Sequence, residues 1–121
     1  MSEVKHMFLR DTDLVKELDR AIDAYLTSYS YYNKALSTDS RDKAKLLIDL
    51  AGMQAARFGE RSGCVECRMM LETAYDALKK AIEEGEELED DFIAWVEKQV
   101  QEALIAFIIK KIREKCGEKH G

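Results

Sequence analysis

The chain has 121 residues, a length that allows one domain with a single hydrophobic core. It contains no proline and six glycines, and its 46% apolar and 36% charged residues exclude a disordered chain and disfavour a β-sandwich or barrel. The formal net charge of -5 excludes a positive field over the whole molecule, so any contact with nucleic acid or an anionic membrane has to be local.

The pattern of apolar residues predicts an all-α protein, an antiparallel four-helix bundle that fills residues 1–121 as one domain, with residues 1–10 and 117–121 loosely ordered. The first helix is expected over about residues 13–36, with N-cap candidates at 11–13. Its apolar residues recur at spacings of three and four, as in a helix seam: Val15, Leu18, Ile22, Tyr25, Tyr29, Tyr32 and Leu36.

The segment 37–40 (STDS) is the clearest break in the sequence, because its short polar side chains compete for backbone hydrogen bonds. A second helix is expected over about 41–58 and a third over about 64–84. Gly59 and Gly63 bracket a polar stretch that would separate the two helices. A glycine costs only about 1 kcal/mol inside a helix, so one long helix over 41–84 is the alternative.

The fourth helix is expected over about 88–116, with acidic residues at its start and basic residues at its end, as the helix dipole favours. The apolar run 103–109 surrounds this helix, which is more than one face of a small bundle can bury. We interpret the excess as a surface for a partner. The expected interface residues are Val100, Leu104, Phe107, Ile108 and Ile112.

The sequence GCVECRMM contains a Cys-x-x-Cys pair, which has three possible interpretations. Cys64 and Cys67 can be small apolar residues in a helix seam, two ligands of a zinc site completed by Cys116 and His120, or a disulfide or reactive thiol pair. In an antiparallel hairpin, Cys64 would lie level with residue 108, about 12 Å from Cys116 along the fourth helix. We therefore favour packing and expect neither a metal site nor a cofactor.

Two other kinds of site have less support. Arg57, Arg61 and Arg68 would form one stripe if the second and third helices were continuous, which makes them candidates for contact with a nucleic-acid backbone. Both histidines lie near the chain ends, and the sequence has no glycine-rich phosphate loop, so catalysis is not expected. The N-terminal sequence lacks the pattern of a secretory signal, and abundant Glu and Lys are typical of thermophilic proteins.

These observations favour a non-catalytic helical protein in the cytoplasm that acts by association, as a homodimer or with another protein partner, and not in a membrane. A small helical subunit that contacts nucleic acid is one alternative. A metal-binding or redox-responsive protein that uses its cysteines is the other.

Overall fold

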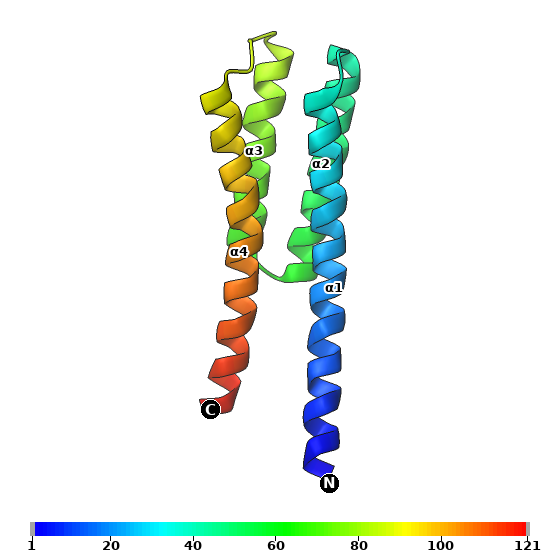
Figure 1. The fold of residues 1–121 in the computed structure, drawn as a ribbon, viewed down its shortest axis with the longest axis vertical. Helices are drawn as coiled ribbons and strands as arrows, with labels where there is room; N and C mark the ends of the chain where they lie inside the picture. Colours follow the sequence, from blue (N-terminus) through cyan, green and yellow to red (C-terminus); the bar gives the residue numbers. More distant parts are fainter. Residues whose placement is uncertain (1, 121) are drawn as a thin grey trace.

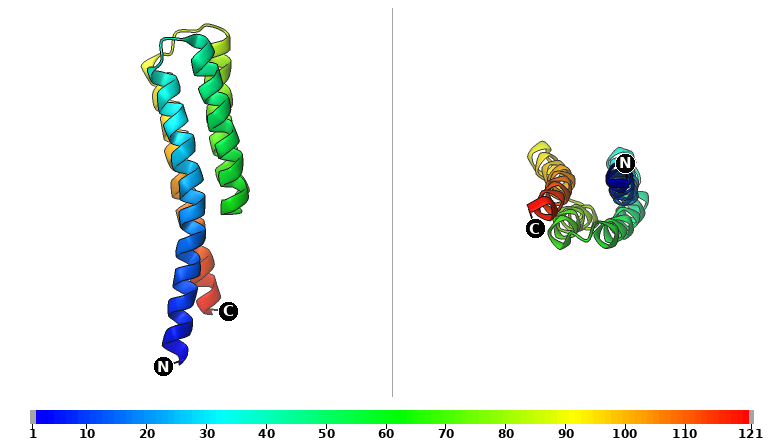
Figure 2. Two further views of the ribbon diagram at one scale, coloured as in Figure 1. Left: turned by 90° about the vertical axis from the view of Figure 1, so that its right-hand side faces the viewer. Right: turned by 90° about the horizontal axis from the view of Figure 1, so that it is seen from below.

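A computed structural model describes the backbone of residues 2–120 and the side chains of 15, 16 and 18–116. Over residues 2–120 the backbone forms four helices and no strand: α1 (Ser2–Ser37), α2 (Arg41–Ser62), α3 (Val65–Glu83) and α4 (Asp90–His120). The chain direction alternates from each helix to the next (Figure 1). Viewed along the bundle, the helices form an arc in which each packs on its neighbour in the sequence, with α1 and α4 at the two ends (Figure 2). The expected helical bundle is confirmed.

The first helix begins earlier than the sequence predicts. The backbone is helical from Ser2, so the polar residues 11–13 lie within α1 and do not cap it. No proline or glycine precedes Gly52, and Asp and Thr inside a helix cost only a few tenths of a kcal/mol each, so nothing at 11–13 forces the helix to end. The expectation that 1–10 and 117–121 are loosely ordered falls on residues whose side chains lie outside the described part.

The second and third helices are separate, which excludes the alternative of one long helix. Gly63 has a φ of 63°, a left-handed conformation that glycine adopts without steric cost, and its N–H donates to the Gly59 carbonyl. Cys64 then caps α3. The helix α2 continues to Ser62, four residues past the expected end at 58, because Gly59 is accommodated inside it.

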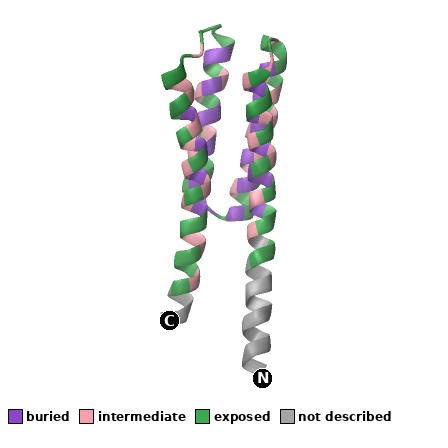
Figure 3. Ribbon diagram, in the orientation of Figure 1, coloured by how far each residue is buried: buried purple, intermediate pink, exposed green. Residues whose placement is uncertain are grey.

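Small and aromatic residues make the core of the bundle. On α1 the buried positions include Ala21, Tyr25, Ser28, Tyr32 and Ala35, again spaced by four and three. The actual seam is thus rotated from the expected one, whose first residue, Val15, is 53% exposed. Figure 3 shows the buried positions on the sides of the helices that face one another. No helix in the described part of the chain is long and apolar enough to cross a membrane.

Candidate functional site

The fourth helix carries apolar residues on two opposite faces, and the structure separates them. One face, made of Val96, Val100, Ala103 and Phe107, is fully buried against the rest of the bundle. The other exposes a row of isoleucines together with a tryptophan. The exposed fractions are 40% for Trp95, 52% for Ile105, 43% for Ile109 and 57% for Ile112.

The expected interface is therefore partly wrong. Val100 and Phe107 belong to the core, where the Phe107 ring packs edge-on against Phe58 at a centroid distance of 5.4 Å. Leu104 is half-buried, and Ile108 and Ile112 are exposed as expected. Because apolar residues surround this helix, the sequence pattern shows that it has two contact surfaces without showing which one is internal.

A regular seam runs along the exposed side of α4. Its residues are spaced by four and three in strict alternation, as in a coiled coil, and all are exposed or half-exposed: Asp91, Trp95, Lys98, Glu102, Ile105, Ile109 and Ile112. We call this set the outer seam. Its only charged pair in the middle is Lys98 and Glu102, whose side chains lie 3.9 Å apart on the same helix. The outer seam has the residue spacing that a second helix requires.

Three tyrosines of α1, Tyr25, Tyr29 and Tyr32, connect α1 to α4 across the open side of the arc. The Tyr25 hydroxyl donates to the Val100 carbonyl at 2.9 Å, and the Tyr32 hydroxyl donates to a carboxylate oxygen of Glu97 at 2.7 Å. The Tyr29 hydroxyl donates to the other carboxylate oxygen. We call these contacts the tyrosine bridge. They hold α4 to α1 and, together with the packing of α4 on α3, set which of its faces points outward.

The electrostatics of the tyrosine bridge follow from its burial. Burial raises the pKa of Tyr25 and Tyr32 well above the ordinary value of 10.0, and the neighbouring Glu97 carboxylate adds to both shifts. For Tyr29, the bond to Glu97 is the larger cause of a raised pKa. Burial alone would raise the pKa of Glu97, but the bonds that it accepts outweigh burial and lower its pKa. Glu97 is thus held as a carboxylate.

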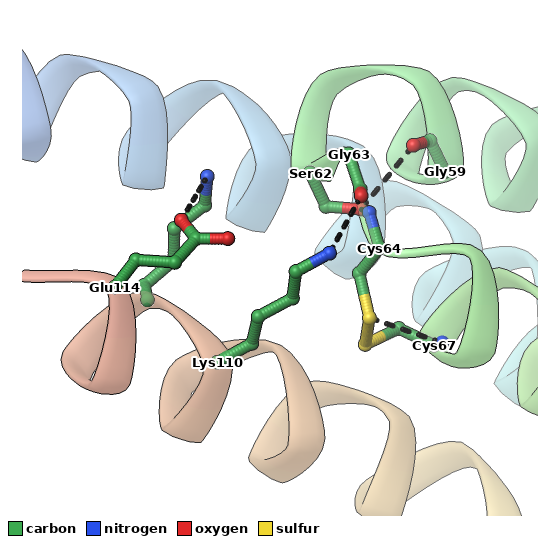
Figure 4. Close-up of polar contacts among 8 residues, drawn as sticks. Gly59, Ser62, Gly63, Cys64, Cys67, Lys110 and Glu114 are labelled. Atoms are coloured by element: carbon green, nitrogen blue, oxygen red, sulfur yellow. Dashed lines mark hydrogen bonds and ion pairs between the residues drawn. A yellow bond between two sulfur atoms is a disulfide. The ribbon is translucent and has the colours of Figure 1, made fainter. Parts of the chain in front are cut away.

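The Cys-x-x-Cys pair lies where α2 ends and α3 begins. Cys64 and Cys67 form a disulfide, with their Cα atoms 5.3 Å apart. The Cys64 sulfur also accepts the backbone N–H of Cys67 at 3.2 Å, which caps the helix. From α4, the ammonium group of Lys110 donates to the carbonyl of Gly63 at 2.8 Å, beside the disulfide (Figure 4). Both cysteines are buried, as packing predicts, but they are also bonded to each other.

The structure does not assemble the candidate zinc ligands. Cys64 and Cys67 are joined to each other, and Cys116 is an exposed free thiol near the end of α4. Within the described residues, no three His, Cys, Asp or Glu side chains come together as a group that could hold a metal. His120, the fourth candidate ligand, lies outside the residues whose side chains are described.

The three candidate arginines for nucleic-acid contact do not form one stripe. All are exposed, but the break at Gly63 puts Arg57 and Arg61 on α2 and Arg68 on α3. Arg61 donates to the carbonyl of Arg20, while Arg68 pairs with Glu72 at 2.7 Å, a contact that raises the pKa of Arg68. The stripe was predicted for a continuous helix, and contact with nucleic acid itself stays a prediction.

A hollow of about 320 Å³ lies at the same end of the bundle as the disulfide. Its lining residues come from α1, α2, the α2–α3 connection and α4: Arg20, Glu60, Arg61, Ser62, Gly63 and Lys111. Three of them carry a positive charge and one a negative charge, so the hollow is cationic. Sequence reasoning missed it because its residues are far apart in the chain and share no motif.

Comparison of the chain with known protein families, curated proteins and solved structures gives no match. The function is therefore inferred from the geometry alone.

Proposed function

We propose that this is a non-catalytic protein that associates with a second copy of itself through the outer seam of α4. The observation that supports the proposal most is a row of three isoleucines and one tryptophan exposed at coiled-coil spacing on a helix whose opposite face is already buried. Singly scattered apolar residues on a surface need no explanation, whereas four large apolar side chains along one exposed helix face do.

Charge complementarity favours a second copy of the chain as the partner. Acidic residues dominate 86–91, where α4 begins, and basic residues dominate 110–115 near its end. In an antiparallel pair of α4 helices, the acidic end of each copy lies beside the basic end of the other. A two-fold arrangement uses the same surface on both copies, so a helix with opposite charges at its two ends is complementary to itself.

One antiparallel register aligns the outer seams of the two copies layer by layer, with Asp91 opposite Ile109 of the second copy toward each end. It places Trp95 opposite Ile105 of the second copy and, in the two middle layers, Lys98 opposite Glu102 of the second copy. The same register places Arg113 opposite Glu87 of the second copy. Each unlike pair occurs twice because of the two-fold axis, so the polar residues at the centre neutralise each other and also specify the alignment. We propose this association for a cytoplasmic protein.

The test is a single charge placed in the exposed row. Ile109→Glu puts a carboxylate into the exposed isoleucine row, opposite Asp91 of the second copy, without disturbing the core, because Ile109 is 43% exposed in the single chain. We expect the unmodified protein to have the mass of two chains and the variant to have the mass of one, with unchanged helical circular dichroism. Phe107→Glu is not suitable, because Phe107 is part of the core.

Leu46→Glu is the matched control, since Leu46 is 59% exposed on α2, away from the outer seam. It should leave the mass at that of two chains. An Ile109→Glu protein that keeps the mass of the unmodified protein would contradict the proposal.

A further inference from the structure

The connection between α2 and α3 combines a disulfide with a cationic hollow. We propose that Cys64–Cys67 is a thiol–disulfide exchange site for small anionic thiols, which the hollow binds through Arg20, Arg61 and Lys111. This inference does not require association through α4, because none of its residues is in the outer seam, although Lys110 and Lys111 belong to the basic end of that helix.

The position of Cys64 favours exchange chemistry. Its sulfur lies at the N-terminus of α3 and accepts the N–H of Cys67 at 3.2 Å. A thiolate formed on Cys64 would keep this bond and would also be stabilised by the positive end of the helix dipole. The ammonium group of Lys110, held at the Gly63 carbonyl, adds a second positive charge nearby (Figure 4). Cys64 is therefore a good leaving group in the second step of an exchange, when it separates from a bound thiol.

The disulfide contributes little as a structural link between distant parts of the chain. Its two cysteines are separated by only three positions in the sequence, so it closes a ring within a single helical turn and joins no two helices. The helix α3 keeps its N-cap after reduction, because the cap is the Cys64 sulfur and not the bond between the sulfurs. The fold can therefore persist in both redox states.

The hollow offers positive charge that can bind the negatively charged end of a small thiol. Ser62 and Gly63 line it, and the Cα of Gly63 is about 4 Å from that of Cys64. Arg61 is oriented by its bond to the Arg20 carbonyl, at 3.1 Å, and the side chain of Lys111 is only 17% exposed. The carboxylates nearby, Glu60 in the lining and Glu114 paired with Lys111 at 3.5 Å, leave a net positive charge.

The exchange proceeds in two steps, and its atoms and electrons balance. The thiolate of a first small thiol attacks the sulfur of Cys64, a residue that is 4% exposed, whereas Cys67 is fully buried. The bond between the cysteines breaks, and Cys67 leaves with the electron pair and takes up the proton that the thiol lost. A second thiolate attacks the sulfur of the bound thiol, and Cys64 leaves as a thiolate. Two small thiols become one small disulfide, and the protein disulfide becomes two thiols.

The test compares three propanethiols that differ only in the group at the far end: a carboxylate, a hydroxyl or an ammonium. The protein carries Cys116→Ser, so that only the pair reacts. Reduction is stopped with an alkylating reagent and followed by mass spectrometry, with rates divided by the thiolate concentration. We expect the carboxylate compound to react fastest, about tenfold faster than the ammonium compound at low salt. Equal rates, or reduction only after the protein unfolds, would overturn the proposal.

A charge variant then locates the effect. The triple variant Arg20→Gln, Arg61→Gln, Lys111→Gln should abolish the preference for the carboxylate compound and leave the rate of the hydroxyl compound within about twofold. A control with the same loss of charge at the other end of the bundle, Lys43→Gln, Lys45→Gln, Lys80→Gln, should keep the preference. A preference that survives in the first variant, or is lost equally in the control, would contradict the assignment to the hollow. If the first variant does not fold, the comparison of the three thiols on the parent protein still tests whether the site prefers the carboxylate compound.

Discussion

Glu97→Ala should be among the most destabilising single changes on the surface of this protein. The carboxylate accepts bonds from Tyr29, Tyr32 and Gln101, and hydrogen bonds to a charged group contribute about 1.5–3 kcal/mol each. Tyr32 is fully buried, so its hydroxyl would lose its partner without access to water, whereas Tyr29 is half-buried and can bond to water instead. We count the bond from Tyr32 in full and discount the bonds from Tyr29 and Gln101. The free energy of unfolding should then fall by about 3 kcal/mol.

The loss is measured as the change in the free energy of unfolding by urea, with the m-value used to verify a single transition. Glu72→Ala is the control, because the exposed pair with Arg68 should contribute no more than about 1 kcal/mol. Adding Tyr32→Phe to both the parent and the Glu97→Ala protein completes a double-mutant cycle. We expect a coupling of at least about 1 kcal/mol between the two sites. A coupling below about 0.5 kcal/mol would refute the assignment of this bond as the main connection between α1 and α4.

Three further predictions concern stability. Gly59→Ala should destabilise the protein by about 1–3 kcal/mol, because the new Cβ would lie 2.4–2.9 Å from side-chain carbons of Arg68. Gly52→Ala, whose new Cβ would have nothing within 4 Å, should stabilise the protein by about 0.5–1 kcal/mol. The two variants should therefore shift the melting temperature in opposite directions. Replacing Cys64 and Cys67 with Ala should cost about 3 kcal/mol, of which about 2 kcal/mol is the chain entropy of a four-residue ring and about 1 kcal/mol is the lost N-cap of α3. The helical circular dichroism should stay unchanged, and loss of the helices would contradict this. Because the pKa values of the bridge tyrosines are raised above 10.0, stability should be full below pH 10.0 and fall as the pH rises toward the folded values, with tyrosinate absorbance appearing only as the helices unfold.

Acid should weaken the same bridge from the other side of the pH range. The pKa of Glu97 lies below the ordinary 4.5, so its stabilising contribution is present above pH 4.5 and is lost as the pH falls through the folded value. This stabilisation is absent from Glu97→Gln, which should therefore lose less stability than the parent protein between neutral pH and acid.

The sequence was sufficient to predict four helices and most of their boundaries, because their periodicity and the break at 37–40 are local properties. It could not decide whether Gly63 interrupts a helix. A glycine is tolerated inside a helix, as Gly59 is, or ends one, as Gly63 does with its left-handed φ of 63°, and the residue type alone does not distinguish the two cases. The early start of α1 has the same origin, since weakly unfavourable residues do not force an end.

The face of α4 that carries the candidate site could not be read from the sequence either. Its apolar residues surround the helix, so the periodicity is weak, and tertiary contacts choose the internal face. Glu97 and the tyrosines contribute to that choice together with the packing of α4 on α3, yet in the sequence Glu97 is one of many glutamates. The cationic hollow depends on residues from three helices, and no local pattern connects Arg20 with Lys111.

The central claim is that the outer seams of two copies pair in one antiparallel register, and reversal of its central charges tests this most directly. Glu102→Lys places four positive charges at the centre of the pair, while Lys98→Glu combined with Glu102→Lys restores the opposite charges. Sedimentation equilibrium at low salt should give the mass of two chains for the unmodified protein, one chain for Glu102→Lys, and two chains again for the double variant. An unmodified protein with the mass of one chain, or a double variant that does not recover the pair, would contradict the account.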